Sequence, residues 1–235
     1  QMLAFECTEN KRLIAEAEGI PKLVAVLSSG TAVAQESAAA ALQSLTESSD
    51  SQDAIVEAGG VNPLLTLVTS GTSAAQESAA GALRNLSAKE RHRLLVAEAG
   101  GIAYLIRLLD VGSVDAQEHA ALALQSLASD NAENKRTIAQ LGGIRPLVNL
   151  VAGGASDTAR VGAAGALQSL ATEEGNQASI VDAGGVAPLL ALLDGDCPVA
   201  QERACGACLG IAANDGTRAA LLDVGGVEKL VRILS

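Results

Sequence analysis

The stretch Ala58-Gly59-Gly60-Val61 decides the fold, because close copies of it return along the chain at a nearly constant spacing. The other copies with two glycines are Ala99 to Ile102, Leu141 to Ile144, Ala183 to Val186 and Val224 to Val227, and Ala17-Glu18-Gly19-Ile20 has Glu in place of the first glycine. The second glycines, at positions 19, 60, 101, 143, 185 and 226, are therefore 41, 41, 42, 42 and 41 residues apart. A unit that recurs in this way predicts a stacked repeat protein.

The glycine pair is expected to separate two helices. A segment with helical spacing, residues 52–58, precedes it, and the apolar run Leu64 to Val68 follows it. Glycine can end a helix in the left-handed conformation without a Cβ penalty, and a second glycine lets the next helix approach closely. Proline follows in the first turn of the next helix, where it is tolerated, at Pro21, Pro63, Pro146 and Pro188. A glycine-rich phosphate cradle is the alternative, but the equivalent copies favour architecture, and no Lys-Ser or Lys-Thr follows them.

Composition points to an all-helical array with an aliphatic core. Hydrophobic residues make up 49% of the 235 residues, but aromatic residues only 1%, namely Phe5 and Tyr104. No run alternates with the period of a strand. No apolar stretch approaches the 18 residues of a membrane span, so we expect no direct membrane insertion. No secretory signal is visible at the start of the sequence.

The charge balance makes nucleic acid an improbable partner. The net charge is −11, and the only dense basic cluster is Lys89, Arg91 and Arg93, whereas a nucleic-acid surface needs many clustered cations. The cysteines, Cys7, Cys197, Cys205 and Cys208, do not form the dense framework of a small secreted domain. These observations favour an intracellular protein, in the cytoplasm rather than another compartment.

Each unit is predicted to hold three helices. The first ends before the glycines, and an apolar residue stands five positions ahead of the second glycine in every copy, as at Ile55 and Val96. Polar stretches that offer Ser, Asp or Asn as N-caps, such as residues 48–51, 129–131 and 173–176, precede the first helices. The second helix is apolar almost all round, which predicts burial between neighbouring units; its middle position is allowed to be polar, at Thr66, Arg107, Asn149 and Arg232.

The third helix is predicted to run for about 15 residues. Apolar residues recur at i, i+3, i+4 and i+7 and define one buried face; the first two copies are Ala38, Ala41, Leu42 and Leu45, then Ala79, Ala82, Leu83 and Leu86. This face also includes Leu124 in the third copy. The remaining positions are expected to line an open surface.

Three helices per unit of about 42 residues, with glycines between the first two and a long third, resemble the armadillo repeat family. Gly60-Val61-Asn62-Pro63-Leu64-Leu65 and the string from Gly81 to Ser87 carry the resemblance most clearly, and the Gly/Ala-rich composition is similar to arrays of plants, algae and protists. The resemblance implies an all-α solenoid, wound into a right-handed superhelix. We expect one continuous domain, residues 1–235, with units near 1–46, 47–88, 89–129, 130–171 and 172–213 and a partial unit at 214–235.

The same resemblance implies a non-catalytic interaction scaffold that binds a partner along the groove of the third helices. Nuclear-import receptors of the family carry Trp, and four residues later Asn, on this helix. Here the Trp places hold Ala40, Gly81, Leu122, Gly165 and Gly206, and the Asn places hold Ser44, Asn85, Ser126, Ser169 and Gly210. Only Asn85 matches, so a receptor for nuclear-localisation signals is not favoured.

Catalytic and cofactor chemistry is not indicated. Cys205 and Cys208 form a CxxC, but within a helix rather than at the helix N-terminus that a redox pair uses. With Cys197 they supply only three thiols, whereas a closed zinc site takes four ligands. His92 and His119 lie in different predicted helices without a sequence partner for a triad. We therefore expect no enzyme activity, no metal and no cofactor.

The candidate groove residues share the face of the third helix that avoids the core. They are Glu36, Gln43, Ser44, Glu77, Arg84, Asn85, Glu118, His119, Gln125, Ser126, Gln168, Ser169 and Glu202. The glutamates line up as a carboxylate ladder that would attract a basic extended or helical protein segment, or each would favour only the N-terminus of its own helix. Small residues at the Trp places predict a shallow, open floor.

Two other functions stay open on the sequence. The chain could be the substrate-recognition part of a multidomain enzyme such as a U-box ubiquitin ligase, or a structural spacer in a large assembly. We also expect the native protein to continue past both ends of this sequence, or another chain to cover them, because helix 227–234 would leave Leu230, Val231, Ile233 and Leu234 poorly covered.

Overall fold

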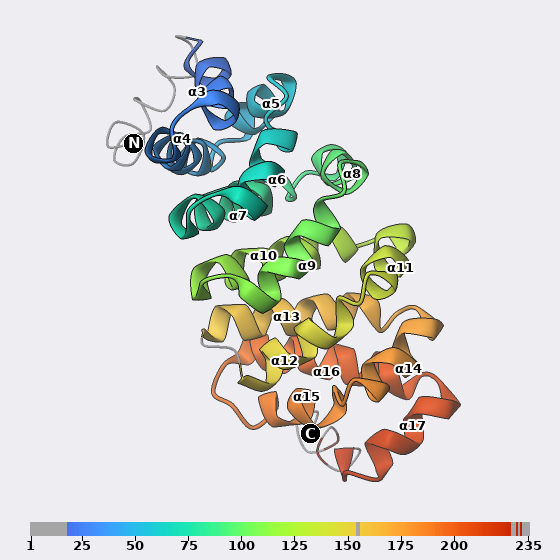
Figure 1. Cartoon of the computed structure of the whole chain (residues 1–235). Coiled ribbons are helices and arrows are strands. Elements are labelled where there is room, and N and C mark those ends of the chain that lie inside the picture. The colour runs from blue at the N-terminus through green and yellow to red at the C-terminus, as the bar shows by residue number, and fades with distance from the viewer. Residues whose placement is uncertain (1–17, 154–155, 227–228, 230, 232–235) are drawn as a thin grey trace. The chain divides into compact units, whose positions relative to one another are not determined.

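The computed structural model describes residues 18–153, 156–226, 229 and 231, and in these ranges it contains helices and no strand (Figure 1). The all-α class predicted from the sequence is confirmed. Contacts group the chain into two compact units, residues 1–123 and 124–235. None of the described helices is long and apolar enough to cross a membrane. The predictions made for Phe5, Cys7, Leu230, Ile233 and Leu234 concern positions outside the described residues.

The described helices fall into the three predicted kinds. The first helices are α5 (Ser49–Glu57), α8 (Glu90–Glu98), α11 (Ala132–Gln140), α14 (Glu174–Asp182) and α17 (Asp215–Leu222). The second helices are α3 (Gly19–Ser29), α6 (Val61–Ser70), α9 (Gly101–Val111), α12 (Ile144–Gly153) and α15 (Val186–Leu192). The third helices are α4 (Ala32–Leu45), α7 (Ser73–Leu86), α10 (Val114–Ala128), α13 (Asp157–Leu170) and α16 (Pro198–Ala212).

The two glycines of each pair are needed for different reasons. Gly59 has φ 74°, in the left-handed region, and a Cβ there would meet nothing within 4 Å. Gly60 has an ordinary helical backbone, but a Cβ on it would lie 2.9 Å from the carbonyl oxygen of Ile55. The N–H of Gly60 donates to that oxygen and the N–H of Gly59 to the oxygen of Val56, both at 2.9 Å. This is a Schellman motif, so the first glycine meets a conformational need and the second a need for space.

The second helices form the centre of each repeat. In the first unit α6 contacts both α7 of its own repeat and α9 of the next, and in the second unit α12 contacts α13 and α15. Leu64 and Leu67 of α6 are buried, but Thr66 between them is exposed, as are Arg107 and Asn149 at the same place. The helix is therefore not buried all round, because one strip of it faces solvent.

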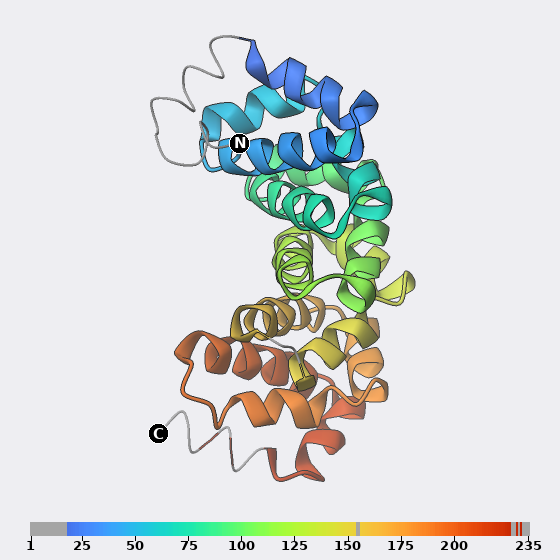
Figure 2. The same ribbon diagram turned by 60° about the vertical axis from the view of Figure 1, so that its left-hand side comes forward.

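Four of the third helices, α4, α7, α10 and α13, begin at a side-chain cap, and α16 has none. The hydroxyl of Thr72 accepts from the N–H of Ala75, three residues on, at 3.2 Å. The hydroxyls of Thr31, Ser113 and Ser156 accept in the same way at the start of α4, α10 and α13. The predicted buried face is confirmed at Ala38, Ala41, Leu42 and Leu45. It is wider than predicted, because Ala39 and Ala164 are also fully buried. The cause is that α4 contacts α7, and α13 contacts α16, side by side (Figure 2).

Candidate functional site

A hollow of about 410 Å³ lies on the third helices of the first unit. It is lined by residues of α4, of α7 and of the first half of α10, together with Glu47, which follows α4. The structure brings together here six of the residues expected in the groove: Gln43, Ser44, Glu77, Arg84, Asn85 and His119. The other lining residues are Ala40, Glu47, Ser78 and Gly81.

Asn85 is held in place by the preceding repeat. Its Nδ2 donates to Thr46 Oγ1 at 3.0 Å, and Thr46 Oγ1 in turn donates to the carbonyl oxygen of Gln43 at 2.6 Å. Thr46 is fully buried and caps the C-terminus of α4. The side-chain amide of Asn85 is therefore fixed at the edge of the hollow, with its oxygen left to accept a further hydrogen bond.

His119 adds an uncharged imidazole to the hollow at neutral pH. Burial lowers the pKa of His119, and the guanidinium of Arg84 lowers it further, against the opposing charges of Glu118 and Asp115. Its Nε2 lies 3.5 Å from Nε2 of Gln43, and its Nδ1 is buried without a hydrogen-bond partner among the described residues. The ionisable residues that line the hollow are thus Glu47, Glu77, Arg84 and His119.

The glutamates at the start of the third helices contact the next repeat. Glu36 Oε2 accepts from the hydroxyl of Thr72 at 2.7 Å, and Glu77 Oε2 accepts from the hydroxyl of Ser113 at 3.5 Å. Thr72 and Ser113 cap the N-termini of α7 and α10, where a carboxylate is favoured by the helix dipole. Burial raises the pKa of Glu77, and the charge of Asp115 raises it further. Part of the carboxylate ladder thus stabilises contacts between repeats.

The remaining candidates do not line this hollow. Glu118 lies on α10, half-buried, and Glu202 is exposed on α16. Gln125, Ser126, Gln168 and Ser169 are half-exposed in the second unit. One hollow in that unit, of about 400 Å³, is lined by residues around Arg160 and Cys197, and another, of about 500 Å³, by residues around Thr172 and Gln177. Neither contains any of these candidates.

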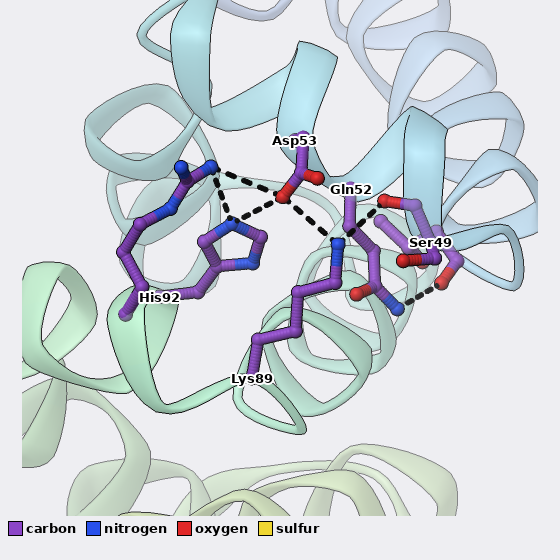
Figure 3. A network of polar contacts seen from close by, with 7 residues as sticks. Ser49, Gln52, Asp53, Lys89 and His92 are labelled. Atoms are coloured by element: carbon purple, nitrogen blue, oxygen red, sulfur yellow. Dashed lines mark hydrogen bonds and ion pairs between the residues drawn. The ribbon is translucent and has the colours of Figure 1, made fainter.

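A polar network on the first helices was missed by the sequence analysis. Asp53 of α5 accepts on one oxygen, Oδ1, from Lys89 Nζ at 2.9 Å and from Arg91 Nη2 at 3.1 Å (Figure 3). Nε2 of His92 lies 2.9 Å from the same oxygen. Lys89 Nζ also donates to the carbonyl oxygen of Ser49 at 2.8 Å. His92 therefore has a charged neighbour, and the dense basic cluster is largely committed to a contact between two repeats.

His92 is fully buried, although its partner Asp53 is partly exposed. It stands nine residues ahead of the second glycine, where later repeats have Asn134 and Asn176. Those amides donate to the carbonyl oxygens of Leu127 and Leu170 at 2.8 and 3.3 Å. Nδ1 of His92 has no hydrogen-bond partner among the described residues. The network is thus an inter-repeat contact around a poorly satisfied buried imidazole.

This buried imidazole should make the chain sensitive to acid. Burial lowers the pKa of His92, and the negative charge of Asp53 offsets only part of this shift. The unfolded chain, with a histidine pKa of about 6.5, therefore binds the proton more tightly. Stability is complete above that value and is lost as the pH falls through it towards the folded-state pKa.

His92→Asn should remove part of this loss, because asparagine occupies the same place in two other repeats. We expect the urea midpoint of the variant to fall less than that of the parent between about pH 7.5 and about pH 5.5. His119→Asn is the matched control at the other histidine, which is half-buried. Equal falls in the parent and His92→Asn would show that His92 does not titrate in this range.

The CxxC of Cys205 and Cys208 lies within helix α16, as the sequence predicted. Cys208 is fully buried on α16, and burial raises its pKa to about 12. Cys197, Cys205 and Cys208 are free thiols. Within the described residues no group of three or more His, Cys, Asp or Glu side chains could hold a metal ion.

Comparison with known proteins identifies the family. The family model for the armadillo/beta-catenin-like repeat matches residues 7–47, 48–88, 89–129 and 131–172, more than half of the chain. The chain therefore belongs to the armadillo/beta-catenin-like repeat family, and its fold is that of a protein-interaction scaffold. No curated protein matches the chain.

Among solved structures the chain is similar to engineered and designed proteins. One engineered protein is 34% identical with a TM-score of 0.84, over 92% of this chain and 89% of that one. A second is 34% identical with a TM-score of 0.90, over 99% of this chain and 57% of that one. A designed armadillo repeat protein in complex with the peptide (KR)4 is 23% identical with a TM-score of 0.78, over 89% of each chain, a likeness that bears on the fold alone.

Proposed function

We propose that this chain is a non-catalytic scaffold that binds a basic extended or helical segment of another protein along the groove of its third helices. The hollow on α4, α7 and α10 carries the proposal, because it gathers polar side chains from three successive repeats around one concave surface. The hollow has two carboxyl groups against one guanidinium, and its imidazole is uncharged. Together with the net charge of −11, this balance favours a cationic partner.

The peptide (KR)4, which a designed member of this fold binds, is a suitable probe. We expect saturable binding to the parent chain that weakens as salt rises, because exposed charges are screened beyond about 10 Å at 0.1 M salt. A peptide of alternating Asp and Glu is the control and should not bind. A structural spacer would show no saturable binding to either peptide, whereas the recognition part of a larger enzyme would behave as the scaffold does.

The carboxylate ladder is tested by replacing Glu36, Glu77 and Glu118 together with glutamine. Glutamine can still accept from the capping hydroxyls, so the contacts of Glu36 and Glu77 to the next repeat are retained while the charge is lost. We expect the triple variant to bind (KR)4 more weakly at low salt, with unchanged helicity. Equal affinity would show that these carboxylates have no binding role.

A further inference from the structure

Three third helices carry a glycine in their middle, at Gly81 in α7, Gly165 in α13 and Gly206 in α16. Glycine is less favourable than alanine inside a helix. None of the three has a positive φ that would require glycine. Their presence therefore needs an explanation outside the helix itself.

A glutamine from the preceding repeat occupies the space that a side chain would take. A Cβ on Gly81 would lie 2.7 Å from Cδ of Gln43. The same construction places a Cβ on Gly165 at 2.6 Å from Cδ of Gln125, and one on Gly206 at 2.7 Å from Cδ of Gln168. Each glutamine amide therefore lies where a Cβ on the next third helix would be. The open floor expected from small residues is thus covered by amide groups.

Among the described third helices, one neighbouring pair, α7 with α10, lacks both the glutamine and the glycine. At the equivalent places the second repeat has Arg84 and the third has Leu122. The glycine is therefore present only where the preceding third helix has the glutamine. This indicates that the glycine makes room for the glutamine and does not serve helix packing in general.

These glutamine amides have donors and acceptors that can pair with a bound segment. A glutamine amide offers two N–H donors and an oxygen with two acceptor sites. Gln168 Oε1 accepts from Arg203 Nη1 at 3.3 Å. At Gln125 the hydroxyl of Ser129 donates to the backbone oxygen and not to the side-chain amide. Gln43 lines the hollow of the first unit, with its Nε2 3.5 Å from Nε2 of His119. An amide held in this way can pair with an N–H and a C=O of an extended backbone.

We propose that Gly81, Gly165 and Gly206 are positioning residues, which hold the amides of Gln43, Gln125 and Gln168 where they hydrogen-bond the backbone of a bound extended segment. This rests on the proposed function of the groove and deepens it: charge attracts the partner, and the amides select an extended main chain. The amides do so without reading the partner's side chains.

Backbone recognition can be separated from charge with two peptides. The probes are (KR)4 and the same peptide with alternate backbone nitrogens methylated, which keeps every charge but removes N–H donors. Affinities are measured by fluorescence anisotropy at one salt concentration. We expect the parent to prefer the unmethylated peptide by about three- to tenfold, the worth of one or two hydrogen bonds.

Gly81→Ala should lower that preference, because the new Cβ displaces the amide of Gln43, one of the three. Gln43→Ala should lower it by the same factor with Gly81 intact, and the double variant should show no further loss. Gly175→Ala is the matched control: Gly175 lies in α14, a Cβ there meets nothing within 4 Å, and the preference should be kept.

Each outcome has a definite meaning. A parent that binds (KR)4 without preferring it over the methylated peptide overturns the inference but leaves the proposed function. A preference that is undiminished in Gly81→Ala or in Gln43→Ala also overturns it. A parent that binds neither peptide overturns the proposed function, and the inference with it.

Discussion

Replacing Leu124 by alanine is expected to lower the free energy of unfolding by about 2–5 kcal/mol, the usual cost of a cavity left by a buried leucine. Leu124 lies on α10 with none of its surface exposed. In a stacked array each repeat is stabilised by its neighbours, so a cavity in the middle of the chain weakens the packing on both sides. Urea denaturation monitored by helical circular dichroism measures the change.

Gln125→Ala is the control for Leu124→Ala, because the two residues are adjacent on α10 but differ in burial. Gln125 is half-exposed and lies over Gly165, so its truncation should change stability by no more than about 0.5 kcal/mol. Equal costs for the two substitutions would contradict the assignment of Leu124 to the core and Gln125 to the groove.

Gly101→Ala is expected to destabilise the chain by about 1–3 kcal/mol, as overpacking does. A Cβ on Gly101 would lie 2.6 Å from the carbonyl oxygen of Val96 and equally close to its Cγ1. The carbonyl belongs to the backbone that ends α8, so the clash cannot be relieved by a change of side-chain rotamer. Thermal and urea denaturation would both record the loss.

Gly175→Ala serves as the reference for Gly101→Ala, because it adds the same methyl group to a helix where nothing lies within 4 Å. It should raise stability by about 0.5–1 kcal/mol through helix propensity. A stabilising effect at both positions would show that the second glycine of the repeat is not needed for close packing.

The sequence was informative wherever a position depends on its own repeat. The helix-ending glycines, the apolar residue at Ile55 and the buried face through Leu42 could all be predicted, because helix geometry and period determine them. The middle of the second helix could be assigned only in part: the polar residue was expected, but not that Thr66 marks a solvent-exposed strip.

The contacts between repeats could not be predicted, because they depend on the reach of particular side chains across a gap. Asp53 and His92 are 39 residues apart, a little less than one period, so a search at exactly one period misses them. Glu36 with Thr72 and Glu77 with Ser113 share a separation of 36 residues. That recurring offset was present in the sequence, but its meaning depends on how neighbouring third helices are staggered.

The hollow itself was anticipated by residue type and missed in one detail. Gln43, Asn85 and His119 were expected in a groove and do line one hollow. Glu47 was not expected, because it lies beyond the end of α4, although it follows Gln43 by one helical turn. The glutamine amides over Gly81, Gly165 and Gly206 were also unexpected, because a glycine in the middle of a helix suggests empty space beside it.

Locating the bound peptide tests the central claim most directly. In a titration of the whole chain with (KR)4, followed by backbone amide NMR, the account predicts that the largest shift changes fall on residues around the hollow, at Gln43, Gly81, Arg84 and Asn85. The network of Asp53 and Lys89 on the first helices should be unaffected at matched salt. Shift changes concentrated on α5 and α8, with the hollow unchanged, would contradict binding in the groove of the third helices.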